Sequence, residues 1–86
     1  MKIIDESWGG DPASLNTQII SGIGIFIDTY KDKYNRALLV SKMSKLPPEA
    51  IIRDGRVMVN GGNKRYARAI LSYYNKGIRN RLEDKI

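Results

Sequence analysis

The segment Arg53–Arg68, RDGRVMVNGGNKRYAR, contains the strongest local structural signals in this chain of 86 residues. Asp54-Gly55 lies between two apolar runs, and an Asp-Gly pair in that setting is a strong short-range signal for a β-hairpin. Asn60-Gly61-Gly62 then predicts the end of the second strand. We therefore expect a hairpin over residues 50–60, followed directly by a helix.

The residues after the hairpin predict the best-defined helix of the chain, over residues 63–77. Asn63 would cap its start, and Gly77 would follow its last turn. At 100° per residue the apolar side chains fall on one arc, which should place Tyr66, Tyr73 and Tyr74 against the core. The opposite face is polar and cationic and contains Arg65, Arg68, Ser72, Lys76 and Arg79, with Lys64 and Asn75 beside it. Residues 78–86 are expected to form a basic tail.

A second helical pattern precedes the hairpin. From Leu15 onward, apolar residues recur in steps of three and four, which predicts a helical segment over residues 14–46 that bends toward its end. Ser14 would cap the segment, and Pro47-Pro48 would end it. The stretch IISGIGIFI within it is rich in β-branched residues and glycine and locally favours a strand. A β-rich N-terminal half, with strands near residues 18–30 and 36–45, is therefore the alternative.

These elements indicate one small α+β domain over residues 1–86. It would consist of an N-terminal arm (1–13), a long helix, a short β-hairpin and a C-terminal amphipathic basic helix. A helix of ~30 residues spans ~45 Å, more than the diameter of ~25 Å expected for a globule of this size. We therefore expect a homo-oligomer in which the apolar stripe packs on its copy, through Leu15, Ile19, Gly22, Ile23, Phe26, Ile27 and Tyr30.

The formal net charge of +6 is unevenly distributed along the chain. Residues 1–52 contain six cations and six acids, so this half is neutral. Residues 53–86 contain nine cations against Asp54, Glu83 and Asp84. Because the whole excess lies in the last part of the chain, the sequence indicates a polyanionic partner for that side of the molecule.

Nucleic acid is the polyanion that this pattern favours. Arginine and lysine dominate contacts to nucleic-acid backbones, and Gly61-Gly62 before a helix would offer backbone amides to an anion. Ser72 and Asn75 stand among the cations and could contact base edges. The predicted binding residues are Arg53, Arg56, Lys64, Arg65, Arg68, Ser72, Asn75, Lys76, Arg79 and Arg81. The alternative is a protein-binding module or inhibitor whose basic face docks on an acidic protein surface.

Catalytic chemistry has few candidates in this composition. The chain lacks cysteine and histidine, which removes the usual nucleophilic thiol, the usual general base and the usual zinc ligands. We expect no enzyme activity, no metal and no cofactor. No apolar stretch approaches the ~20 residues of a membrane span, and the N-terminus lacks a secretory signal. A cytoplasmic regulator or accessory protein is the class expected from the sequence.

Overall fold

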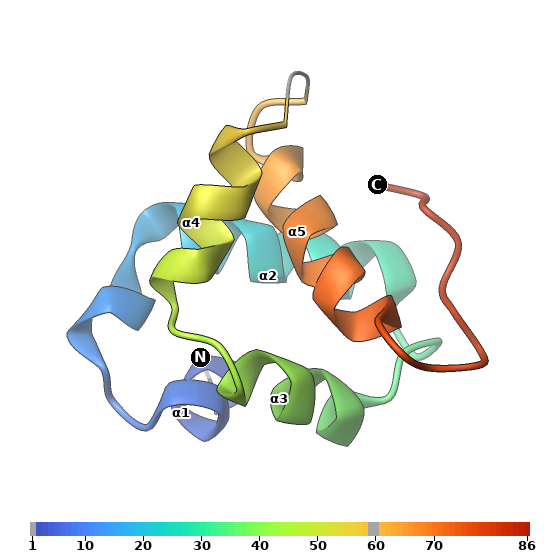
Figure 1. Cartoon of the computed structure of the whole chain (residues 1–86), viewed down its shortest axis with the longest axis horizontal. Coiled ribbons are helices and arrows are strands. Elements are labelled where there is room, and N and C mark those ends of the chain that lie inside the picture. The colour runs from blue at the N-terminus through green and yellow to red at the C-terminus, as the bar shows by residue number, and fades with distance from the viewer. Residues whose placement is uncertain (1, 59–60) are drawn as a thin grey trace.

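The computed structural model describes residues 2–58 and 61–86, and every regular element within those residues is helical. The elements, shown in Figure 1, are α1 (Lys2–Trp8), a 3-10 turn η1 (Pro12–Leu15), α2 (Thr17–Tyr30), α3 (Arg36–Ser44), α4 (Glu49–Arg56) and α5 (Lys64–Asn75). The predicted α+β fold is therefore wrong, and so is its β-rich alternative. Residues 59 and 60 of the expected hairpin lie outside the described residues.

Residues 50–56 of the expected hairpin fold instead as part of α4. Pro48 occupies the capping position before Glu49, so the proline pair marks a helix start as well as the end of the preceding helix. The charges also suit a helix, because an acid lies in the first turn and Arg53 and Arg56 lie in the last, as the helix dipole favours. These helical signals are weaker than the Asp-Gly signal but agree with the structure.

Gly55 explains why the Asp-Gly pair misleads. A tight hairpin needs a positive φ at such a glycine, but Gly55 is helical and is absent from the positive-φ glycines of the described residues. It is buried against the ring of Tyr66, and a Cβ at Gly55 would lie 2.4 Å from the Tyr66 Cδ1 atom. Glycine is therefore needed here for close packing rather than for a turn.

The expected helix over residues 14–46 is divided. The apolar stripe is helical from Thr17 to Tyr30, and its N-cap is Asn16 rather than Ser14, since the Asn16 Oδ1 accepts from the Gln18 amide at 2.7 Å. The helix ends where Lys31 adopts a φ of 51°. Asn35 then caps α3, with its Oδ1 atom 3.0 Å from the Leu38 amide nitrogen.

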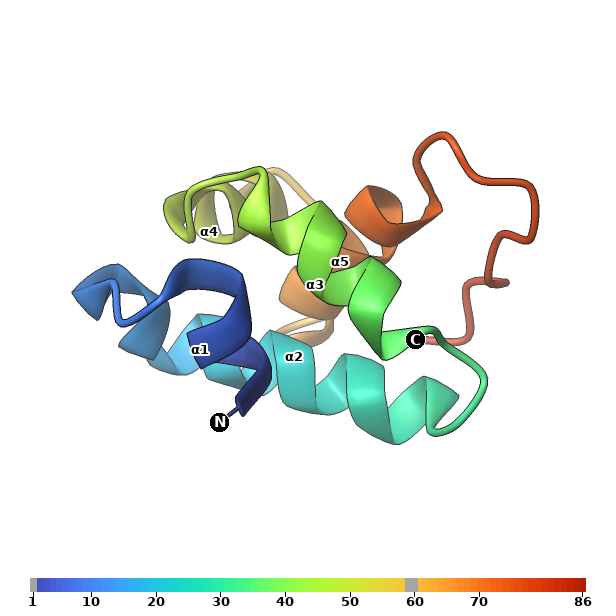
Figure 2. The same cartoon turned by 90° about the horizontal axis from the view of Figure 1, so that it is seen from below.

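The core forms mainly where α2 crosses α5. The α2 side chains Ile19, Ile23, Phe26 and Tyr30 are at most 3% exposed, and they pack with the apolar arc of α5. In Figure 2, α1 and α2 lie along one side of the molecule, with α3, α4 and α5 above them. The expected N-terminal arm is partly helical, and its Ile3 and Ile4 side chains join the core.

The stripe expected to bind a second copy is thus covered within the chain. Of the seven expected interface residues, Ile19, Gly22, Ile23, Phe26 and Tyr30 are buried and Ile27 is partly buried, while Leu15 is 67% exposed. The argument for a homo-oligomer from the length of one helix fails, because two shorter helices replace it.

Gly22→Ala and Gly24→Ala form a matched test of the α2–α5 crossing. A Cβ at Gly22 would lie 2.8 Å from the Tyr66 Cβ and 3.0 Å from its carbonyl carbon, whereas a Cβ at Gly24 meets nothing within 4 Å. Gly22→Ala should destabilise the fold by about 1–3 kcal/mol. Gly24→Ala should stabilise it by up to about 1 kcal/mol through helix propensity. Urea unfolding monitored by circular dichroism measures both; equal effects of the two changes would contradict this packing.

Gly55→Ala tests the α4–α5 contact. Alanine has the better helix propensity, but its methyl group would enter the space of a fully buried ring, so the free energy of unfolding should fall by about 1–3 kcal/mol. Arg56→Ala, one residue further along α4 at an exposed position, is the control and should change stability by no more than about 0.5 kcal/mol. A Gly55→Ala variant at least as stable as the parent chain would show that Tyr66 does not occupy this position.

Candidate anion-binding cleft

A cleft of about 490 Å³ lies where α3, α4 and α5 meet. Its lining residues are Lys42 from α3, Lys45 and Leu46 from the segment after it, Arg53 and Asp54 from α4, Tyr73 from α5 and Lys76 from the end of α5. Four cations face one carboxylate, which leaves a formal charge of +3. The cleft therefore has the charge and the concave shape that suit an anionic ligand.

The single carboxylate of the cleft is already satisfied. Asp54 accepts from the Arg53 Nε atom at 3.0 Å and from the Tyr73 hydroxyl. These bonds, the one from Arg53 first, hold the pKa of Asp54 below its usual value. Burial, and then the bond to Asp54, raise the pKa of Tyr73, so the phenol stays neutral at physiological pH. Asp54 consequently positions Arg53 and Tyr73 and leaves the three lysines uncompensated inside the cleft.

Lysines from the neutral half of the sequence complete the cleft. Lys42 donates a hydrogen bond to the main-chain carbonyl of Lys76, which ties α3 to the end of α5. Lys45 is exposed and has no ion pair within the described residues. An ammonium group has three donors, so Lys42 retains two for a ligand.

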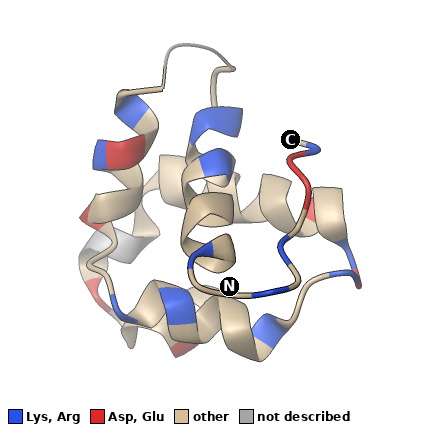
Figure 3. Ribbon diagram, turned by 45° about the vertical axis from the view of Figure 1, so that its right-hand side comes forward, with Lys and Arg blue, Asp and Glu red and all other residues tan. Residues whose placement is uncertain are grey.

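The structure brings only two of the ten predicted binding residues into this cleft, Arg53 and Lys76. Arg56, one turn beyond Arg53 on α4, lines a hollow with Ile52 and Val57 instead. In Figure 3 the cationic positions are spread over several helices and the C-terminal segment. The single cationic face expected on the last helix is therefore divided among different parts of the surface.

Arg65 and Arg68 are engaged in contacts within the chain. The Arg65 Nε atom donates to the Gly62 carbonyl at 2.8 Å, and its guanidinium lies 5.4 Å from the centre of the Tyr66 ring. Arg68 donates to the Ile86 carbonyl at 2.8 Å and approaches Asp84 at 3.8 Å. Both arginines thus stabilise the α5 start and the C-terminal segment.

The two expected base-contacting residues also bond within the chain. The Ser72 hydroxyl donates to the Ala69 carbonyl at 2.7 Å. The Asn75 side chain bonds both main-chain groups of Leu82, donating at 2.9 Å and accepting at 2.8 Å. These two bonds hold the Asn75 side chain against the tail and leave it one N–H donor and one acceptor lone pair.

The remaining predicted residues lie at the ends of α5. Gly61 and Gly62 have φ values of 111° and 54° and form the turn into α5, where their carbonyls accept from Lys64 and Arg65. The Lys64 side chain is exposed at the first turn of α5, and Arg79 and Arg81 are exposed in the tail. None of these residues lines the cleft.

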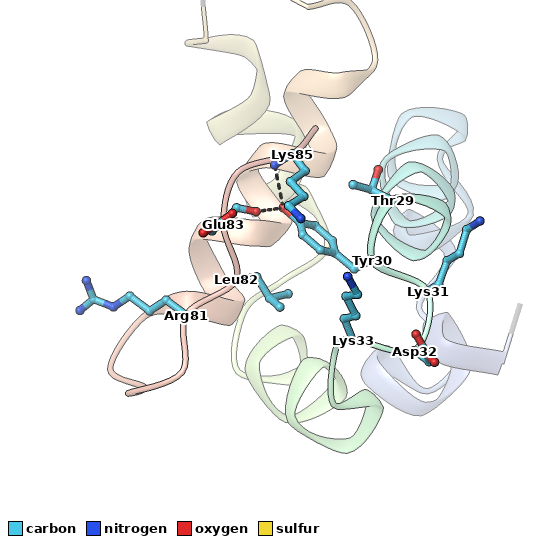
Figure 4. Close-up of a pocket in the computed structure, with 9 residues that line it drawn as sticks. All are labelled: Thr29, Tyr30, Lys31, Asp32, Lys33, Arg81, Leu82, Glu83 and Lys85. Atoms are coloured by element: carbon cyan, nitrogen blue, oxygen red, sulfur yellow. Dashed lines mark hydrogen bonds between the residues drawn. The ribbon is translucent and has the colours of Figure 1, made fainter.

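The C-terminal tail lies near the end of α2, and the two segments border a second cavity of about 510 Å³ (Figure 4). The Tyr30 hydroxyl anchors the tail by donating to the Glu83 carbonyl at 2.5 Å and accepting from the Lys85 amide at 3.2 Å. Asp32 and Glu83 line this cavity together with its cations, and Figure 4 shows Lys31 and Arg81 extending outward on opposite sides of Tyr30. The arrangement is less cationic than the α3–α4–α5 cleft.

Sequence reasoning missed Lys42, Lys45 and the role of Tyr73. The two lysines belong to a half of the chain with no net charge, so a count along the sequence hides them. Tyr73 was expected only in the core, yet its hydroxyl reaches Asp54 and lies 2.9 Å from the Ala50 carbonyl oxygen. The available signal was the pair of lysines three residues apart, just before the prolines.

The described residues contain neither a metal-binding cluster nor a membrane-spanning helix. Within residues 2–58 and 61–86, no cluster of three or more potential metal-binding side chains is present. None of the helices in those same residues has the length and apolar character needed to cross a membrane.

Tyr73→Phe tests the electrostatics of the cleft. The variant loses the hydroxyl bond that helps to lower the pKa of Asp54, so that pKa should rise toward its ordinary value. A carboxylate whose pKa is lowered by folding stabilises the folded state at pH values above its pKa in the unfolded chain, which is near 3.9 for Asp. This stabilisation is lost as the pH falls through the pKa of the carboxylate in the folded state. Tyr73→Phe should lower the free energy of unfolding in part because it raises the pKa of Asp54. That part of the loss should be complete at neutral pH and should shrink as the pH falls below about 4.

Urea unfolding at a series of pH values measures this dependence. Tyr34→Phe is the matched control, because the Tyr34 hydroxyl has no hydrogen bond within the described residues. Its effect should be small and independent of pH. A Tyr73→Phe loss that is the same at pH 3 and pH 7 would contradict the bond to Asp54.

Comparison with known proteins places the chain in one family. Residues 1–83 match the model of a family described as "Family of unknown function (DUF6551)". No curated protein matches the chain, and no solved structure matches it. Because the match extends over nearly the whole chain, the protein belongs to the DUF6551 family.

Proposed function

We propose that the protein is a non-catalytic nucleic-acid-binding protein and that the α3–α4–α5 cleft binds the phosphate backbone. The observation that supports this function is the convergence of Lys42, Lys45, Arg53 and Lys76 from three parts of the chain on one cleft with a single, already bonded carboxylate. This cleft differs from the cationic face of α5 expected from the sequence, where Arg65 and Arg68 are engaged by the chain itself.

The chemistry of the cleft suits phosphate rather than a specific base sequence. Lysine ammonium groups act as point charges for phosphate oxygens, and Arg53 retains donors after its bond to Asp54. Contacts of this kind fix position on the backbone and are insensitive to sequence. A regulator or accessory role in the cytoplasm, with DNA or RNA as partner, is the setting that this function implies.

A salt titration tests the function. Binding of fluorescent duplex DNA and single-stranded RNA is measured by anisotropy over a range of salt concentrations. Each phosphate contact contributes about −0.9 to the log–log slope for duplex DNA and about −0.7 for a single strand, so four contacts predict a slope of about −3 to −4.

The variant Lys45→Ala should weaken binding to all sequences and flatten the slope by about one unit. Lys33→Ala removes an equal charge from the exposed α2–α3 connection, outside the cleft, and should leave the slope unchanged. Equal effects of the two changes would show that binding does not use the cleft.

Failure to bind either nucleic acid at about 0.15 M salt would overturn the proposal. Co-purification with an acidic protein, abolished by Lys45→Glu but not by Lys33→Glu, would then assign the cleft to a protein partner.

A further inference from the structure

A partly apolar groove lies on the other side of α4 from its contact with α5. Leu15 is 67% exposed and Val57 is 77% exposed, and each lines one of two hollows of about 370 and 640 Å³. Both hollows are bordered by Asn16, Glu49 and Ile52, so they form one continuous groove between α4 and the start of α2. Exposed apolar side chains that gather around a groove are typical of an interaction surface.

The charges along α4 identify the kind of partner that fits. Glu49 and Arg56 both border the groove and are exposed, and neither forms an ion pair within the described residues. They are seven residues apart, close to two helical turns, so they lie on the same face, ~10 Å apart along the axis. Ile52 lies between them on the same side of the groove. One end of the exposed α4 face is thus acidic and its other end basic. Its middle holds Ile52 beside Arg53, and the charge of Arg53 is paired with Asp54.

We infer that this groove binds a second copy of the chain through α4, with the two helices antiparallel about a two-fold axis near Ile52. An isologous contact places the same surface of both copies together. In this arrangement Glu49 faces Arg56 of the second copy and Arg56 faces Glu49 of the second copy. Leu15 and Val57 border the same contact and lose solvent exposure. An acid and a base at equal distances from the axis make the surface complementary to itself.

This inference does not rest on the proposed function. The covered stripe of α2 no longer supports self-association, whereas Leu15, the exposed member of that stripe, belongs to the groove. Exposed ion pairs contribute little to affinity but specify which arrangement forms. The apolar side chains therefore supply most of the affinity, and the charges supply the register.

Charge reversal provides a sharp test by sedimentation equilibrium of the full chain. Glu49→Arg leaves two cations at the ends of the groove, and Arg56→Glu leaves two acids, so each variant alone should dimerise at least about tenfold more weakly than the parent. An equimolar mixture of the two variants should regain dimers, since every reversed charge then meets its opposite. The double variant Glu49→Arg/Arg56→Glu should also dimerise.

Apolar variants form the second part of the test. Val57→Ser should weaken the dimer, whereas Ile20→Ser, which changes a 37% exposed side chain outside the groove, should leave it unchanged. All substituted positions are exposed, and circular dichroism checks that every variant remains folded.

Three results would each overturn the inference. A parent chain that stays monomeric up to about 1 mM, the concentration of a very weak interaction, excludes the dimer. Dimers that are insensitive to Val57→Ser use another surface. Dimers that are weakened by Val57→Ser, but are not restored by mixing the two charge-reversed variants, do not have the antiparallel α4 register.

Discussion

The contact of Tyr66 with Gly22 and Gly55 determines how the three central helices of this protein meet. Tyr66 belongs to α5 and is 1% exposed. Gly22 of α2 lies against its Cβ and main chain, and Gly55 of α4 lies against its ring. No other residue type fits at either glycine without displacing this side chain. A single aromatic residue therefore fixes α2 and α4 on the same helix, and the remaining elements pack around that arrangement.

The candidate cleft depends on the same contact. With α4 held against α5, the Tyr73 hydroxyl reaches both Ala50 and Asp54, and Asp54 in turn holds Arg53. The lysines of α3 and of the segment after it approach from the third side, and Lys42 is bonded to the end of α5. The other surface of α4 is left with Ile52 and Val57 at the edge of a groove. The cationic cleft and the partly apolar groove thus lie on different sides of one short helix, and Arg53 borders both.

The parts of the fold that could be predicted are those in which periodicity extends over many residues. The stripe through Ile19, Ile23 and Phe26 and the amphipathic pattern of α5 both identify helices. The eight-residue α4 could not be recognised in this way, because it contains the Asp-Gly pair of a hairpin. The reason for its glycine is a contact with Tyr66, eleven residues further along the chain, and no local pattern reveals such a contact. Similarly, Lys31 ends α2 with a positive φ although lysine gives no turn signal.

The site was less predictable than the helices. A count of charge along the chain selected residues 53–86, and Arg53 and Lys76 from that set do line the cleft. The count could not show that Arg68 and Asn75 bond to the tail. Nor could it show that Lys42 and Lys45, from the neutral half, approach Arg53 in space. Which cations remain available to a partner depends on tertiary contacts.

Nuclear Overhauser contacts of Tyr66 in solution test directly whether this side chain holds α2 and α4 against α5. This packing predicts strong cross-peaks from the Tyr66 ring protons to the Gly55 Hα protons, and from the Tyr66 Hβ protons to the Gly22 Hα protons. The Gly55 Hα resonances should also be shifted by the ring current, and the backbone shifts of residues 49–56 should be helical. Absence of both sets of cross-peaks, together with extended backbone shifts over residues 50–56, would contradict it.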